Sequence, residues 1–65
     1  MEYTNSQIRG LIAEHIHSSR DRIILEKRLI DGLTYERISE DMDMSTRQIK
    51  NIIYKNEKIL FSKLP

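Results

Sequence analysis

Polar side chains able to bind DNA bases follow one another shortly after Ser45. They are Arg47, Gln48, Lys50 and Asn51. In the major groove an arginine can bind guanine through two hydrogen bonds, and an asparagine or glutamine can bind adenine in the same way. Lysine binds backbone phosphate through its charge. We therefore predict base contacts from Arg47, Gln48 and Asn51 and a phosphate contact from Lys50.

A second group of side chains is expected at the edge of the predicted DNA-binding surface: Thr46, Tyr54, Lys55, Tyr35 and Arg37. Tyr54 and Lys55 come about two helical turns after Arg47, where a helix lying in the groove reaches the DNA backbone. Tyr35 and Arg37 begin the preceding predicted helix, whose N-terminus suits phosphate. Two alternatives remain: Tyr35 can instead be a partly buried packing residue, and the polar residues after Ser45 can form a merely solvated helix face. Arg28 is expected to pair with Glu26, Asp31 or another acid rather than with DNA.

Residues 33–61 have the apolar spacing of two short helices joined by a tight turn, a helix-turn-helix. Ser45 and Thr34 are suitable N-caps for these helices, because a serine or threonine hydroxyl accepts a hydrogen bond from a free backbone N–H of the first turn. Leu33 can pack on Ile38 as a hydrophobic staple. The positions expected to be buried are Ile38, Met42, Met44, Ile49 and Ile52.

The rest of the chain predicts further helices and no strand. Residues 5–17 form an accessory N-terminal helix with an apolar stripe, and Ser19 is expected to cap a helix over residues 20–30 that ends at a left-handed Gly32. The last helix is expected over residues 46–62. The predicted fold is therefore all-α, with four helices in one helix-turn-helix domain spanning residues 1–65.

Charge is distributed unevenly, although the net charge is only +1. Residues 1–43 contain six Lys or Arg and nine Asp or Glu, a net of −3, whereas residues 44–65 contain five and one, a net of +4. Cations near the C-terminus of a helix, such as Lys58 and Lys63, also complement the helix dipole. That explanation does not cover Arg47 and Lys50 near the start of the helix, so the basic half favours phosphate as its ligand.

Several classes of function are disfavoured. The chain has no cysteine, and His15 and His17 would point about 200° apart on a helix, so no metal site is expected. No nucleophile elbow or glycine-rich phosphate loop is present, and we expect neither an enzyme, nor a cofactor, nor a small-molecule substrate. Without an apolar run of membrane-spanning length or a signal-peptide pattern, we expect a cytoplasmic protein with no membrane contact.

Three segments resemble region 4 of bacterial sigma factors: Arg20-Asp21-Arg22-Ile23-Ile24-Leu25, Gly32-Leu33-Thr34-Tyr35-Glu36-Arg37-Ile38, and Ser45 through Ile49-Lys50. The resemblance covers residues 20–64, and LuxR-type DNA-binding domains share much of the pattern. Asp43 replaces a turn residue that is often glycine in the family, and aspartate tolerates positive φ better than most residues. A sigma factor also needs a promoter-melting region, which we do not expect in this chain. The resemblance therefore implies a stand-alone bacterial or phage regulator of transcription.

The expected partner is double-stranded DNA. Region 4 of sigma factors also binds protein, so the alternative is a module that docks on RNA polymerase or another regulator, which the acidic N-terminal half would suit. A homodimer is a further expectation, because a small core is expected to leave apolar residues of the first and last helices uncovered. Its predicted interface comprises Ile8, Leu11, Ile12, Ile59, Phe61 and Leu64.

Overall fold

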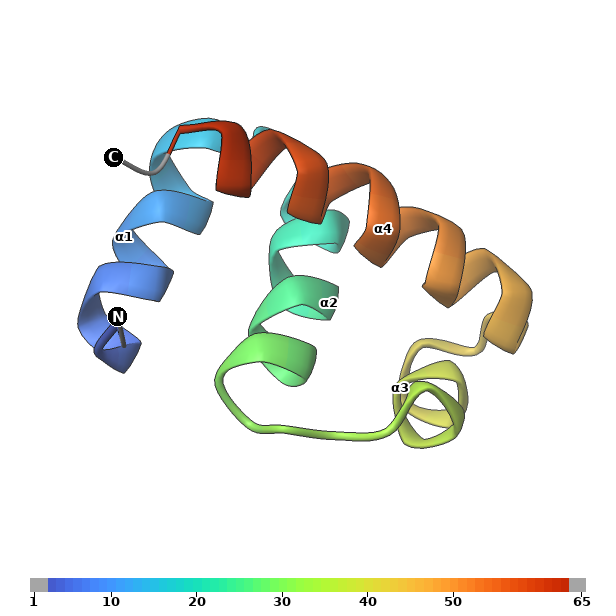
Figure 1. The fold of residues 1–65 in the computed structure, drawn as a ribbon. Coiled ribbons are helices and arrows are strands. Elements are labelled where there is room, and N and C mark those ends of the chain that lie inside the picture. Colours follow the sequence, from blue (N-terminus) through green and yellow to red (C-terminus); the bar gives the residue numbers. More distant parts are fainter. Residues whose placement is uncertain (1–2, 64–65) are drawn as a thin grey trace.

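A computed structural model describes residues 3–63, which form four α-helices and no strand. The helices are α1 (Asn5–His15), α2 (Ser19–Leu29), α3 (Tyr35–Met42) and α4 (Thr46–Ser62). The predicted all-α class is confirmed for this part of the chain. The long α4 lies across the other three helices, with α1 under its C-terminal end and α3 near its N-terminal end (Figure 1). None of the described helices is long and apolar enough to cross a bilayer.

Each helix begins after a hydroxyl side chain that accepts a backbone N–H of the first turn: Thr4, Ser18, Thr34 and Ser45. The predictions for Thr34 and Ser45 are confirmed. The prediction for Ser19 is wrong, because Ser18 has the extended backbone and its Oγ accepts from the Asp21 N–H at 3.3 Å. Local sequence offers both serines, and only one position satisfies the cap geometry.

The predicted extent of the first helix is also wrong at its end. The helix stops at His15 rather than at residue 17, because Ile16 has an extended backbone. The Arg22 side chain then donates to the carbonyls of Ile16 and Ala13, which supplies donors at this helix end. Free carbonyls at a helix C-terminus need such partners.

Two residues with positive φ end α2 and α3, as predicted. Gly32 has a φ of 70° and Asp43 has φ 54° and ψ 48°. The left-handed Asp43 reverses the chain, and the Met44 N–H donates to the Ser39 carbonyl at 3.0 Å. The turn between Met42 and Thr46 therefore needs only three residues, which holds the start of α4 close to α3.

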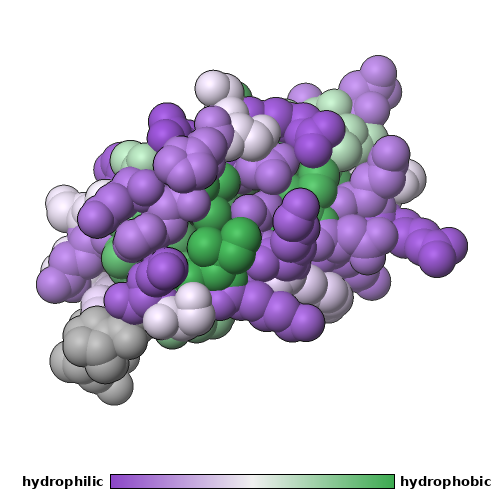
Figure 2. Space-filling model, turned by 90° about the horizontal axis from the view of Figure 1, so that it is seen from above, coloured by the Kyte–Doolittle hydropathy of each residue, from purple (hydrophilic) through white to green (hydrophobic). Residues whose placement is uncertain are grey.

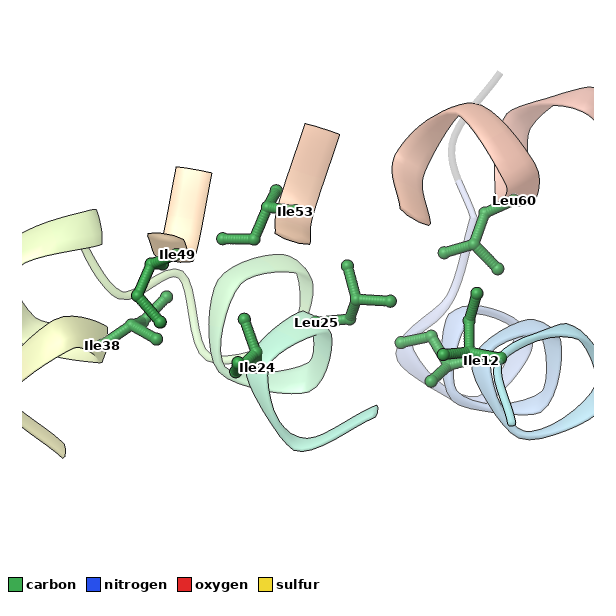
Figure 3. Close-up of a cluster of buried hydrophobic side chains, with 8 residues drawn as sticks. Ile12, Ile24, Leu25, Ile38, Ile49, Ile53 and Leu60 are labelled. Atoms are coloured by element: carbon green, nitrogen blue, oxygen red, sulfur yellow. The ribbon is translucent and has the colours of Figure 1, made fainter. Parts of the chain in front are cut away.

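The core lies beneath α4 and consists of eight buried residues: Ile12, Ile16, Ile24, Leu25, Ile38, Ile49, Ile53 and Leu60. Ile49 faces Ile38 of α3, and Leu60 lies above Ile12 of α1 at the other end of the cluster (Figure 3). Of the five positions expected to be buried, Ile38 and Ile49 are fully buried. The other three, Met42, Met44 and Ile52, are partly buried and pack against the core, as Leu33 does.

One polar residue of α4 is buried. Asn56 is only 4% exposed, and its Nδ2 donates to the Asp21 Oδ2 at 3.2 Å and to the Ile52 carbonyl at 2.8 Å. A buried amide that loses its water needs such partners, since an unpaired one costs stability. The contact joins α4 to α2 and sets how the two helices align. Its two residues lie 35 positions apart in the chain, so the local sequence does not predict it.

Candidate nucleic-acid interface

The solvent face of α4 presents Arg47, Asn51 and Lys55. These residues are exposed and repeat every fourth position, so they form one stripe along the helix, away from the buried Ile49 and Ile53. In residues 3–63 their side chains have no hydrogen bond or ion pair with another residue. The stripe therefore combines one guanidinium, one amide and one ammonium group that are available to a ligand.

Gln48, the third predicted base-reading residue, is committed to the start of α4. Its Oε1 accepts from the backbone N–H of Ser45 at 3.0 Å and from the Ser45 hydroxyl at 3.1 Å, while the Gln48 N–H donates to the Ser45 Oγ at 3.1 Å. A bidentate contact with adenine needs the amide oxygen as well as the amide nitrogen. In this conformation only the nitrogen is free. The Ser-x-x-Gln pattern of a capping box was visible in the sequence and could have shown this role.

The Tyr35 ring on α3 is contacted by side chains of two other helices, α2 and α4. Its ring lies 4.4 Å from the Arg28 Cζ of α2 and 5.5 Å from the Lys50 Nζ of α4. Tyr54 approaches the same ring edge-on, with ring centroids 6.2 Å apart and an angle of 81° between the planes. Tyr35 is half-buried and packs against the core, as the packing alternative predicts, while the exposed Tyr54 remains at the surface.

Electrostatics within this group favours the neutral form of Tyr54. A side-chain hydrogen bond with Tyr35, followed by the charge of Tyr35, raises the pKa of Tyr54 above its ordinary value. The Tyr54 phenol is therefore protonated at neutral pH, when its hydroxyl can donate a hydrogen bond to an anion.

Arg28 was expected to pair with an acid, and that expectation is wrong. Its Nη1 donates to the Leu33 carbonyl at 2.9 Å, and no carboxylate of the described residues lies within ion-pair distance. The chain reversal after α2 places a carbonyl and the Tyr35 ring at this position. Arg28 thus joins Lys50 and Tyr54 around the Tyr35 ring.

Arg37 and Thr46 are less available than predicted. The Arg37 Nε lies 3.3 Å from the Asp41 Oδ1, one turn further along α3, although 64% of its side chain is exposed. Lys27 approaches the other oxygen of Asp41 at 3.4 Å. Thr46 is half-buried at the first position of α4. Arg37 can still meet an anion, but its charge is already partly offset.

The ion pairs of residues 3–63 all lie outside α4. The Lys and Arg residues that pair with carboxylates are Arg9, Arg20, Lys27 and Arg37, none of which lies on α4. The cations in or directly after α4 have no such partner among the described residues: Arg47, Lys50, Lys55, Lys58 and Lys63. Hydrophilic side chains cover most of the face seen from the α4 side (Figure 2). The positive charge of the second half of the chain is therefore free to attract an anion.

A separate apolar pocket of about 150 Å³ lies between α1, α2 and α4, and its lining comprises Tyr3, Ile8, Leu11, Leu29, Leu60 and Phe61. Phe61 is 55% exposed and Ile59 is 36% exposed, as expected for the sides of α4. Ile12 is fully buried, so its predicted place in a dimer interface is wrong. Leu64 lies outside the described residues. The pocket differs chemically from the basic face, because its lining offers almost no polar group.

No three His, Cys, Asp or Glu side chains among residues 3–63 lie close enough together to hold a metal ion. Comparisons of the chain with protein-family models, with curated proteins and with solved structures gave no match.

Proposed function

We propose that the protein is a helix-turn-helix regulator of transcription, similar to region 4 of sigma factors, and that it binds duplex DNA with α4 in the major groove. The observation that carries this proposal is the stripe of Arg47, Asn51 and Lys55, whose polar groups have no partner within residues 3–63. The opposite side of the same helix is anchored in the core. A rigid helix with free base-reading side chains is the arrangement that major-groove recognition requires.

Roles follow from chemistry and from position along α4. Arg47, near the capped N-terminus, suits a bidentate contact with guanine, and Asn51 suits adenine. Lys55 lies one turn further and suits a backbone phosphate, which positions a protein without reading sequence. Tyr35 and Arg37, at the start of α3, would approach the backbone beside the groove. Such a regulator would act in the cytoplasm.

The first test is to select bound sequences from a random duplex library and then titrate the selected duplex by fluorescence anisotropy. The logarithm of affinity should fall linearly with the logarithm of salt concentration, because bound cations release counterions from DNA. Arg47→Ala should weaken binding and relax the base preference at one position. Arg9→Ala, on α1, is the matched control. Failure to enrich any sequence, together with no binding at low salt, would contradict the proposal.

A second candidate is docking on RNA polymerase or another regulator. It is favoured by the exposed carboxylates Glu36, Glu40 and Asp43 on and just after α3, which have no ion-pair partner among the described residues. They would suit a basic protein surface. Co-sedimentation with purified bacterial RNA polymerase tests this candidate, with Glu36→Lys and Glu40→Lys expected to abolish the complex and to leave folding intact.

A further inference from the structure

We propose that Arg28 and Lys50, positioned by the ring of Tyr35, together bind one phosphate of the DNA backbone. The inference deepens the proposed function and rests on it. It adds Arg28, a residue of α2, to an interface otherwise built from α3 and α4. It also assigns Lys50 and Arg28 to the same phosphate rather than to separate ones.

Arg28 and Lys50 contact the same aromatic ring. The Arg28 guanidinium and the Lys50 ammonium both lie on the Tyr35 ring, at 4.4 and 5.5 Å from its centroid. Arg28 is held by its bond to the Leu33 carbonyl, which uses one of the five N–H donors of a guanidinium. The remaining donors of Arg28 and the three of Lys50 have no hydrogen-bond partner among residues 3–63. Cation–π contacts orient both groups and leave their N–H donors unused.

The charges of Arg28 and Lys50 are near neighbours. Because both lie within 5.5 Å of the centroid of the same ring, the two charges can be no further apart than the two centroid distances combined, which is comparable to a Debye length of about 8–10 Å. At that separation salt screens their repulsion only in part. Lys27 and Arg37 form a similar pair of neighbouring cations, but those two share the carboxylate of Asp41. No carboxylate of residues 3–63 fulfils that role for Arg28 and Lys50, and an external anion would.

The position of Lys50 on α4 indicates which anion would bind there. Lys50 lies one helical turn from Arg47 on α4, so an anion bound by Lys50 would lie beside the stripe proposed to read bases. In duplex DNA the anion beside the groove is a backbone phosphodiester. Its contacts fix the register of a protein on the duplex. A phosphate bound here would tie α2, α3 and α4 to one point of the backbone.

Fluorescence anisotropy with a labelled duplex of arbitrary sequence tests the inference, because phosphate contacts do not depend on sequence. Arg28→Gln, Lys50→Gln and the double variant are titrated over a range of salt concentrations. If both cations bind one phosphate, the salt slope of the double variant should be shallower than that of the wild type by about 0.9, or about eightfold in affinity per tenfold in salt. Each single variant should weaken binding without exceeding that change.

Controls distinguish a failure of the shared-phosphate contact from a failure of the proposed DNA binding. Arg9→Gln, on α1, which does not contact α3, should leave the slope unchanged. A double variant with the wild-type slope would overturn the inference, and so would a change about twice as large, which would mean two separate phosphates. Wild-type protein that binds no duplex at low salt would overturn the proposed function as well.

Tyr35 is tested as a positioning residue with the same readout. Tyr35→Leu removes the ring but neither charge, and should make the salt slope shallower, whereas Tyr35→Phe keeps the ring and should restore it. Circular dichroism checks that each variant is folded. If Arg28→Gln does not fold, the exposed Lys50→Gln alone replaces the double variant, and an affinity and a salt slope that are both unchanged there overturn the inference.

Discussion

Ser45→Ala is expected to destabilise the protein by weakening the start of α4. The Ser45 Oγ accepts the Gln48 N–H at 3.1 Å, and the substitution leaves that donor without its cap. Loss of an N-cap hydroxyl costs about 0.5–2 kcal/mol. The site is exposed, so water can partly replace the hydroxyl, and the Ser45 N–H still reaches the Gln48 Oε1. We therefore expect a loss near the middle of that range, about 1 kcal/mol.

Urea titration followed by far-ultraviolet circular dichroism measures this change. A loss of about 1 kcal/mol corresponds to about 4–8 °C in the melting temperature of a domain of this size. Gln48→Ala removes the other half of the box, and the double variant Ser45→Ala/Gln48→Ala should lose less than the sum of the single variants, because the two side chains share one set of hydrogen bonds.

Ser62→Ala is the matched control. The Ser62 hydroxyl donates to the Ile59 carbonyl at the other end of α4 and caps no N–H, so its removal should change stability by less than about 0.5 kcal/mol. An unchanged urea midpoint of unfolding for Ser45→Ala, with the midpoint of the control also unchanged, would mean that the stability of α4 does not depend on this cap. Additive losses in the double variant would refute the shared box.

Three further predictions concern the surface. Arg47→Ala should cost about 1–3 kcal/mol on a selected operator and little on arbitrary DNA, and equal losses on both would exclude a base contact. Phe61→Glu should convert a homodimer formed at the apolar pocket into monomers in sedimentation equilibrium; a wild-type protein that is already monomeric at micromolar concentration contradicts the dimer. Tyr35→Phe should lower the pKa of Tyr54 toward the ordinary tyrosine value of 10.0 in an ultraviolet titration, because the phenol hydroxyl of Tyr35 raises it. A raised pKa in the folded state contributes stability that is fully present below the pKa of the unfolded chain and is lost as pH rises through the folded pKa.

Local sequence was sufficient for the helices and for most of their ends. Thr34, Ser45, Gly32 and Asp43 act through hydrogen bonds and backbone angles within a few residues, so their roles can be predicted without knowing the fold. The apolar spacing likewise placed Ile38 of α3 and Ile49 of α4 toward the core. The exposed stripe opposite them, which carries the proposed function, was predictable for the same reason.

Contacts between helices could not be predicted in this way. The burial of Asn56 depends on Asp21, which is 35 residues away in the chain, and the place of Arg28 depends on how α2 meets the Tyr35 ring. An arginine can satisfy its charge with a carboxylate, a carbonyl or an aromatic ring, and its sequence neighbours favoured the carboxylate. Which partner it meets is set by the packing of α2, α3 and α4, because that packing brings the Tyr35 ring and the Leu33 carbonyl to Arg28 and leaves the acids elsewhere.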